Sequence, residues 1–244
     1  MATPRFYSST ALTAHQTIEL PQELAHHAIR VLRLKAGTSI VLFDGRGGQF
    51  PATLQIEGKK GFAQTGAHDP VEAELPGEIT LVQGIASGDK MDWIIEKAVE
   101  LGAARVIPIT AQRSVLQLSG DRLIKRQRHW ERIALSASEQ CGRNRIMAID
   151  APVPLQHYMQ QIDPAGQQLL FCHPEAEQTL AQALTPAITK ITLLIGPEGG
   201  WSADEQALVK RHGIEPVRFG GRVLRTETAG LALIAATSAL QRWY

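Results

Sequence analysis

The chain has too few cysteines to depend on disulfides. It contains two among 244 residues, Cys141 and Cys172, and they lack the paired spacing of a zinc site. We therefore expect two reduced thiols, no disulfide framework and no metal site. The N-terminal stretch Met1–Tyr7 lacks the apolar core of a signal peptide, and no apolar run approaches the roughly 18–20 residues that cross a membrane. These absences predict a cytoplasmic chain without a membrane partner.

An excess of charge of one sign is also missing. Lys and Arg number 25 against 24 Asp and Glu, which gives a formal net charge of +1. A nucleic-acid partner must therefore be argued from local clusters of basic residues. With 44% hydrophobic and 20% charged residues, the composition is that of a soluble globular protein. The length suits one large domain or two smaller ones.

Two common phosphate-binding motifs are absent. There is no Gly-x-x-x-x-Gly-Lys-[Ser/Thr], and no Gly-x-Gly-x-x-Gly opens the first βα unit. Instead, glycine-bearing turns occur at 196–200 and 219–221, each after an apolar run and before a helix-like segment. Because glycine has no Cβ, backbone amides in such turns can approach a ligand closely. The two turns indicate one pocket, and its mostly apolar neighbours suit an adenine-bearing cofactor without phosphates.

Residues 1–70 differ in pattern from the rest. A helix is expected at Pro21–Leu34, followed by strands at 39–43, 49–56 and 61–65 with glycine-rich turns between them. The inward side of this helix is expected to hold Leu24, Ala28, Val31 and Leu32. We interpret residues 1–70 as a small β-barrel domain with one helix, 71–77 as a linker and 78–244 as a second domain.

In the second domain, strand-like and helix-like segments alternate. Strands are expected at 79–86, 106–110, 146–149, 168–172, 191–195 and 215–219. Helices are expected at 89–102, 121–141, 153–161, 176–184, 202–212 and 226–242. This alternation predicts an α/β fold with a mainly parallel sheet and helices on both faces. The last helix is rich in Ala and Leu almost all round, so we expect it to be buried within the domain or against a second subunit.

The segment 121–141 has one polar and one apolar side. The polar stripe contains Lys125, His129, Arg132, Ser136, Glu139 and Arg143. The opposite side contains Leu123, Trp130, Ala134, Ala137 and Cys141. A solvated face is the ordinary explanation of such a pattern. The cluster of Glu139, Gln140 and Arg143 favours a second explanation, in which arginine binds phosphate and Glu139 or Gln140 contacts a base edge.

Several polar residues near the glycine turns have a structural explanation. Ser202 and Glu205 form a capping box at the start of a helix. Thr226 or Thr228 suits an N-cap. Glu227 suits the first turn of the last helix, where the helix dipole favours an acidic side chain.

Two motifs carry a resemblance to a known family. Gly196-Pro197-Glu198-Gly199-Gly200 and the stretch 221–229, Gly-Arg-Val-Leu-Arg-Thr-Glu-Thr-Ala, resemble the signature of the SPOUT methyltransferases, specifically the ribosomal RNA small subunit methyltransferase E family. Further similar stretches are 96–102, 138–140 and His27 with Val31-Leu32-Arg33, so the resemblance spans nearly the whole chain. The family's second turn usually reads Leu-Gly-x-Arg-Ile-Leu-Arg. The departures at Phe219, Gly221 and Val223 leave its backbone requirement intact.

The resemblance implies a PUA-like N-terminal β-barrel and a C-terminal SPOUT α/β domain with a deep trefoil knot, which no periodicity could indicate. It also implies S-adenosylmethionine as cofactor and a homodimer whose site lies at the subunit interface. The implied reaction is methylation of N3 of a uridine in the decoding region of 16S ribosomal RNA, and the substrate is either the RNA or the assembled small subunit.

By the resemblance, the cofactor-binding residues are Phe171, His173, Leu194, Ile195, Gly196, Glu198, Gly200, Phe219, Gly220, Val223, Leu224, Thr228 and Ala229. The residues expected to bind RNA are Arg5, Arg30, Arg33, Lys35, Arg46, Arg113, Arg132 and Gln140. For catalysis, Arg143 or Arg225 would stabilise charge on a base oxygen, and Glu139 or Glu227 would receive the N3 proton.

Two other classes of protein compete with a methyltransferase. A Rossmann-type nucleotide enzyme needs a glycine fingerprint after the first strand, which is missing. A non-catalytic ribosome assembly factor of the same fold would use the same RNA surface without the cofactor. Binding of S-adenosylmethionine separates that alternative from the enzyme.

Overall fold

The computed structural model describes residues 3–115 and 120–243. The chain divides into two compact units. The first unit contains the residues up to Glu74 together with Ser138–Ile146, and the second contains Leu75–Ala137 and the residues from Met147 onward. The first unit is therefore discontinuous in sequence, because a short segment from the middle of the chain completes it.

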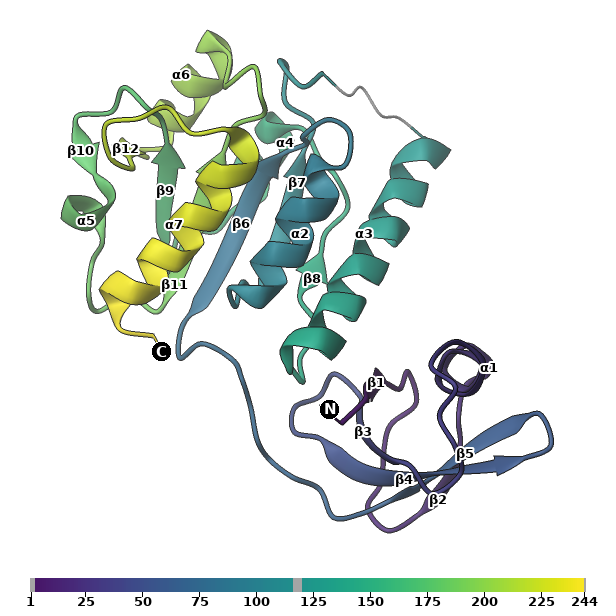
Figure 1. Cartoon of the computed structure of the whole chain (residues 1–244). Helices are drawn as coiled ribbons and strands as arrows, with labels where there is room; N and C mark the ends of the chain where they lie inside the picture. Colours follow the sequence, from purple (N-terminus) through teal and green to yellow (C-terminus); the bar gives the residue numbers. More distant parts are fainter. Residues whose placement is uncertain (1–2, 116–119, 244) are drawn as a thin grey trace. The chain divides into compact units, whose positions relative to one another are not determined.

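The first unit is built on one five-stranded sheet (Figure 1). Its strands are β1 (Arg5–Tyr7), β2 (Thr17–Glu19), β3 (Ser39–Phe43), β4 (Phe50–Glu57) and β5 (Lys60–Thr65). They lie in the order β1-β3-β4-β5-β2; β1 pairs with β3 in parallel, and the other pairs are antiparallel. The three expected strands are confirmed. β1 and β2, of three residues each, are too short to show an alternating pattern in the sequence. Closure of the sheet into a barrel stays a prediction.

The helix expected at Pro21–Leu34 is shorter and changes type midway. α1 spans Gln22–His26 and continues as the π-helix η1, His27–Val31. The Leu32 N–H donates to the His27 carbonyl at 2.9 Å. This bond spans five residues instead of four, so it widens the helical turn.

The wider turn changes which residues face the core. Leu24 and Ala28 are buried as expected. Val31 and Leu32 are 57% and 45% exposed, so the prediction that they point inward was wrong. A π-turn adds residues to each turn, and it rotates both side chains away from the direction that α-helical spacing gives them.

The second unit is a seven-stranded sheet in the order β10-β12-β9-β11-β6-β7-β8 (Figure 1). The pairs between these strands are all parallel. The strands are β6 (Glu78–Gly84), β7 (Arg105–Ile109), β8 (Ala148–Ile149), β9 (Gln168–Cys172), β10 (Gln178–Thr179), β11 (Lys190–Ile195) and β12 (Pro216–Arg218). The predicted α/β class with a parallel sheet is confirmed. From β6 the chain adds strands first on one side and later on the other, so the direction of winding reverses between β6 and β11.

Helices cover both faces of this sheet. They are α2 (Lys90–Glu100), α3 (Asp121–Cys141), α4 (Leu155–Gln161), α5 (Leu180–Ala183), α6 (Ala203–Arg211) and α7 (Thr226–Gln241). α2 and α7 pack against each other, and α7 also packs on β6 and β11 (Figure 1). α4 and α6 pack together, and they bury Leu155 and Val209 against Val82 and Leu194 of the sheet. Among the described residues, no helix has both the length and the apolar content needed to span a bilayer.

Two expected elements of the second unit differ in the structure. The segment 176–184 was expected to be helical, but Gln178–Thr179 forms the edge strand β10 and only Leu180–Ala183 is a helix. The pairing of β10 with β12 extends the sheet by one strand at that edge. The strand expected at 146–149 is limited to Ala148–Ile149, the two residues that pair with Arg105 and Val106 of β7.

The last helix, α7, is buried on one side only. Gly230, Leu233 and Ile234 are buried, whereas Ala239 is exposed and Leu240 is 51% exposed. The expectation that α7 is buried all round within the unit was therefore wrong. Its contacts with the sheet and with α2 use only one side of the helix. The outward side remains a candidate surface for a second subunit.

Candidate functional site

A cavity of about 440 Å³ lies at the carboxyl ends of β9, β11 and β12. This is the edge of a parallel sheet next to the reversal in strand order, where α/β proteins commonly bind ligands. Three segments line it: residues 172–174 after β9, residues 195–201 after β11, and residues 217–226 between β12 and α7. α7 adds Ala229 and Leu233. The two glycine turns thus meet at one pocket, as the sequence predicts.

Thr226 joins the two turns. Its hydroxyl donates to the Gly196 carbonyl at 2.6 Å and accepts from the Gln83 side-chain amide at 2.9 Å. The interpretation of Thr226 or Thr228 as a helix cap was wrong, because Arg225 occupies the N-cap position and makes no side-chain cap bond. Thr226 instead ties the start of α7 to the turn that follows β11.

Glu198 ties the same turn to the loop before α2. Its Oε1 accepts from the Ser87 N–H at 2.9 Å, from the Ser87 hydroxyl at 2.7 Å and from the Lys90 ammonium at 3.1 Å. Burial raises the pKa of Glu198, but the bonds from Ser87 and Lys90 outweigh it and lower the pKa from 4.5 to about 2. The carboxylate is therefore charged at neutral pH. Its Oε2 is buried without a hydrogen-bond partner among the described residues.

Aromatic rings form part of the cavity wall. His173 stacks on Phe171 with ring centroids 6.5 Å apart, and Trp201 packs against Phe171 at 5.6 Å. His173 and Trp201 line the cavity, whereas Phe171 lies behind them in the core. The Trp201 Nε1 is buried without a partner among the described residues. The cavity therefore has one unpaired donor in Trp201 and one unpaired acceptor in Glu198.

The capping box expected after the first glycine turn is confirmed. The Ser202 hydroxyl accepts from the Glu205 N–H, and the Glu205 carboxylate accepts from the Ser202 N–H. Glu205 also accepts from the Gln112 N–H at 2.9 Å. This double contact fixes the start of α6 and holds the turn 196–200 in place.

Most of the residues expected to bind the cofactor line the cavity. Those that do are His173, Ile195, Gly196, Glu198, Gly200, Phe219, Val223, Leu224 and Ala229. Phe171 and Leu194 are buried in the core beside it. Gly220 and Thr228 are exposed outside the lining.

Several lining residues were missed by sequence reasoning. They are Trp201, Gln206, Val217, Arg218 and Leu233. Leu233 could have been found, because Thr226, Ala229 and Leu233 recur at the spacing of one helix face. Trp201 directly follows the glycine turn at 196–200, and this position is the signal that could have found it.

The four catalytic candidates lie in two places. Arg225 is exposed and lines the cavity. Glu227 lies in the first turn of α7, and its Oε2 is buried without a hydrogen-bond partner among the described residues. Glu139 and Arg143 belong to the segment that completes the first unit.

In the first unit, Arg143 is held by a carboxylate. It is 3% exposed, and its Nε and Nη2 donate to Glu74 at 3.0 and 2.6 Å. Glu139 accepts from the Tyr7 N–H at 2.9 Å. Burial raises the pKa of Glu139, although the Tyr7 bond and the charges of His27 and Arg5 oppose this. Both side chains therefore have contacts that stabilise the first unit.

Most of the residues expected to bind RNA are exposed. These are Arg30, Arg33, Lys35, Arg46, Arg113, Arg132 and Gln140. Arg113 also lines the cavity. Arg5 differs, because its guanidinium binds the Gln49 amide oxygen, donates to Asn144 Oδ1 at 2.7 Å and lies over the Phe43 ring at 5.1 Å. Arg5 thus joins segments of the first unit.

Two family models match the chain. The model described as an RNA methyltransferase domain matches residues 73–238, and the model described as an RNA methyltransferase PUA domain matches residues 20–63. The parallel α/β unit, its cavity at the strand ends and these matches define the class of an RNA methyltransferase that carries a PUA domain.

The chain is 32% identical over 234 residues to the ribosomal RNA small subunit methyltransferase E of Buchnera aphidicola. The aligned residues cover 96% of this chain and 92% of the relative. It is 31% identical to the protein of the same name from Bacillus subtilis, with 91% and 90% covered. The chain belongs to the ribosomal RNA small subunit methyltransferase E family.

Solved structures agree with this assignment. The Neisseria gonorrhoeae ribosomal RNA small subunit methyltransferase E bound to S-adenosyl methionine has a TM-score of 0.91 at 34% identity, with 98% of both chains covered. A putative methyltransferase from Legionella pneumophila in complex with the same cofactor has a TM-score of 0.90 at 33% identity, covering 99% of this chain and 98% of that one.

Proposed function

We propose that this protein methylates N3 of a specific uridine in the decoding region of 16S ribosomal RNA, with S-adenosylmethionine as methyl donor. The observation that carries the proposal is the cavity at the strand ends, built from the two glycine turns in a chain of this family. We place the reaction in the cytoplasm, where small ribosomal subunits are assembled.

The cavity has the chemistry that the cofactor requires. Its volume of about 440 Å³ is in the range of small-molecule sites. Apolar side chains such as Ile195, Val223 and Leu224 suit the adenine ring. The unpaired Trp201 Nε1 and Glu198 Oε2 offer a donor and an acceptor for polar groups of the ligand. When bound, S-adenosylmethionine supplies an electrophilic methyl group on a sulfonium sulfur.

The protein must prepare the uridine for attack, because neutral uridine carries a proton on N3. We propose that Glu227 receives this proton, since its carboxylate has an unpaired oxygen at the start of α7. We propose that Arg225 stabilises the negative charge that develops on the base oxygens, since its side chain borders the cavity. Arg143 and Glu139 are weaker candidates, because Glu74 and the Tyr7 N–H already engage them.

Arg225→Ala and Glu227→Gln test these roles. Each variant is expected to lower kcat by about 10²–10³-fold, the range for loss of one charge-stabilising or proton-accepting group. Calorimetric affinity for S-adenosylmethionine should stay within a few fold of that of the parent chain. Arg211→Ala, an exposed change in the last turn of α6, is the matched control. Full turnover in both variants would remove Arg225 and Glu227 from the mechanism.

The RNA surface is proposed to include the exposed basic residues of the first unit. Arg30, Arg33, Lys35 and Arg46 are solvent-accessible and carry the charge that phosphates require. We propose that residues 1–70 act as the RNA-binding domain, followed by the linker at 71–77 and the methyltransferase domain at 78–244. Gln140, Arg113 and Arg132 are proposed as further contacts.

The dimer and the knot are also proposals. The outward side of α7, with Leu240 at 51% exposure, supports an interface between two copies of the chain. Sedimentation of the wild type and of Leu240→Glu tests it, and a dimeric wild type with a monomeric variant is expected. The trefoil knot is proposed from family membership, and it suits the contact of Thr226 with the turn at Gly196.

Two measurements decide the function as a whole. Calorimetry with S-adenosylmethionine separates the enzyme from a non-catalytic assembly factor, because only the enzyme needs the cofactor. Incubation with labelled cofactor and either unmodified small subunits or naked 16S RNA is expected to place one methyl group on N3 of a single uridine. Mass spectrometry locates it, and a methyl group on any other atom would overturn the proposed reaction.

A further inference from the structure

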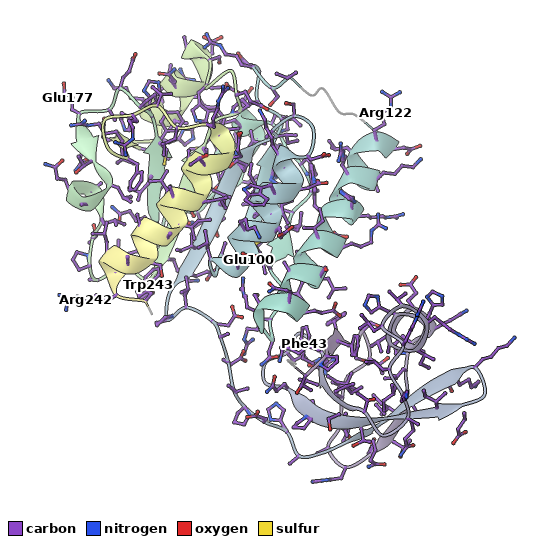
Figure 2. The ribbon with its side chains drawn as sticks, viewed as in Figure 1. Phe43, Glu100, Arg122, Glu177, Arg242 and Trp243 are labelled. Carbon is purple, nitrogen blue, oxygen red and sulfur yellow. The ribbon has the colours of Figure 1, made fainter. Side chains whose placement is uncertain are left out.

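One side of α3 presents a cluster of basic side chains. Lys125, Arg128 and Arg132, here called the α3 basic face, are exposed and line a shallow hollow together with Glu131 and Leu135. α3 as a whole has five Lys or Arg against three Asp or Glu, although the whole chain is almost neutral. Figure 2 shows Arg122 at the start of the same helix, extending away from α2.

Other polar side chains of α3 are directed at α2 instead. Asp92 of α2 accepts from Trp130 Nε1 at 3.1 Å, contacts His129 Nε2 at 2.7 Å and lies 3.8 Å from Arg126. These contacts fix the rotation of α3 about its axis. The polar stripe expected from the sequence therefore divides, with His129 bound to Asp92 and the α3 basic face turned to solvent.

The α3 basic face carries three positive charges, against the single carboxylate of Glu131 in the same hollow. In the part of the chain that the structure describes, no ion pair joins Lys125, Arg128 or Arg132 to an acidic group. Lys125 and Arg132 are seven residues apart, or about 10 Å along a helix that rises 1.5 Å per residue. Three cations within two helical turns can follow successive phosphates of one strand, and the two guanidinium groups can bind phosphate oxygens bidentately.

We propose that the α3 basic face binds the phosphate backbone of the RNA substrate. This inference rests on the proposed function, and it extends the contact proposed for Arg132 to a surface of three cations that contacts RNA without reading its sequence. Phosphate contacts of this kind set the position and orientation of a nucleic acid. The Glu131 carboxylate lies among the three cations, so it repels phosphate and lowers the affinity of the face.

The matched comparison uses two multiple variants of the full chain. The first is Lys125→Gln/Arg128→Gln/Arg132→Gln, which keeps residues that favour a helix. The control is Lys210→Gln/Arg211→Gln, two exposed cations in the last turn of α6. Binding of naked 16S RNA is measured at several salt concentrations. Calorimetry with S-adenosylmethionine and thermal melting verify that each variant keeps the fold.

Loss of the α3 basic face should lower the slope of log affinity against log salt by about 2–3, since each phosphate contact contributes about 0.7–0.9. RNA affinity at low salt should fall by at least about 10-fold. The α6 control should leave slope and affinity unchanged. Glu131→Gln should act in the opposite direction and tighten RNA binding, an effect that misfolding cannot imitate.

The failures are distinguishable. If the wild type methylates RNA but the triple variant and Glu131→Gln bind it as the wild type does, the α3 basic face is not an RNA surface and the proposed function stands. If the triple variant loses affinity for assembled small subunits but not for naked RNA, the face contacts a protein and the inference is overturned. If the wild type binds the RNA but transfers no methyl group, the proposed function is overturned. The binding data on the variants then still decide whether the α3 basic face is an RNA surface.

Discussion

The Glu198 carboxylate accepts a hydrogen bond from the Ser87 hydroxyl at 2.7 Å, across 111 residues of chain. The same oxygen accepts from the Ser87 N–H and from the Lys90 ammonium. These bonds connect the loops that leave two neighbouring strands, β6 and β11. One wall of the cavity is thus held in place by a charged hydrogen bond instead of by packing alone.

Glu198→Gln should make the stability of the protein less dependent on acid pH. The pKa of Glu198 is about 2 in the folded chain against an ordinary 4.5, so the folded state favours the charged form. This contribution is present above pH 4.5 and is lost as the pH falls toward 2. We expect the variant to be less stable than the wild type by about 1–3 kcal/mol at pH 7, with a difference that shrinks in acid.

Urea unfolding between pH 7 and pH 3 measures this difference. Glu175→Gln, a change at an exposed carboxylate, should leave the pH dependence of the wild type unaltered. A stability difference between wild type and Glu198→Gln that is constant over this range would contradict the role given to Ser87 and Lys90.

Thr226→Val should destabilise the second unit, because the hydroxyl makes two hydrogen bonds in a buried position. The change removes the donor to the Gly196 carbonyl and one of the two acceptors of the Gln83 amide, which still donates to the Gly84 carbonyl. The expected loss is about 2 kcal/mol, the usual cost of unpaired buried polar groups. Thr189→Val, at an exposed position, is the control. Equal melting temperatures for the two variants would show that the tie contributes nothing.

Gly84→Ala should distort the cavity, because β6 ends against the first glycine turn. A Cβ on Gly84 would lie 2.5 Å from the Pro197 nitrogen and 2.6 Å from its Cδ. Backbone atoms cannot move aside as a flexible side chain can, so we expect a loss of about 1–3 kcal/mol and weaker binding of S-adenosylmethionine. Gly221→Ala meets no atom within 4 Å and should unfold like the wild type. If Gly84→Ala were as stable as the wild type, the end of β6 and the turn at Pro197 would separate easily.

Arg143→Ala should act on stability before it acts on catalysis. It removes one partner of a buried ion pair and leaves Glu74 uncompensated, which costs about 3–5 kcal/mol. Arg143→Lys should not restore the loss, because an ammonium cannot make the two bonds of the guanidinium. Arg145→Ala is the milder control, since its side chain is 55% exposed. Chemical unfolding and methyl transfer, measured on the same variant, separate the two roles of Arg143. A variant that is fully stable but has no turnover would show that Arg143 is catalytic.

Much of the second unit is readable from the sequence because its strands are buried on both faces. Runs such as 191–195 are apolar except for Thr192, and glycine turns and helix-like patterns mark their ends. The pocket follows from the same features, since turns after parallel strands gather at one edge of the sheet. Local patterns therefore suffice where structure depends on burial and on turns.

Long-range pairing is the part that patterns do not reveal. Nothing near Thr226 indicates that its hydroxyl bonds to Gly196 and Gln83, so a capping residue was the expected role. Arg143 and Glu139 were expected to act on RNA because they end a polar stripe, but their nearest partners come from β1 and from the segment before β6. The π-turn at His27–Val31 is equally hidden, because its residues also fit an α-helix.

The discontinuity of the first unit has a consequence for the order of events during synthesis. Glu74 leaves the ribosome 69 residues ahead of Arg143, its ion-pair partner, and Arg5 precedes Asn144 by 139. The first unit cannot make these bonds until β6, α2, β7 and the whole of α3 have been translated. The N-terminal unit can therefore be completed only after the first part of the second unit has been translated, although each unit has a core of its own.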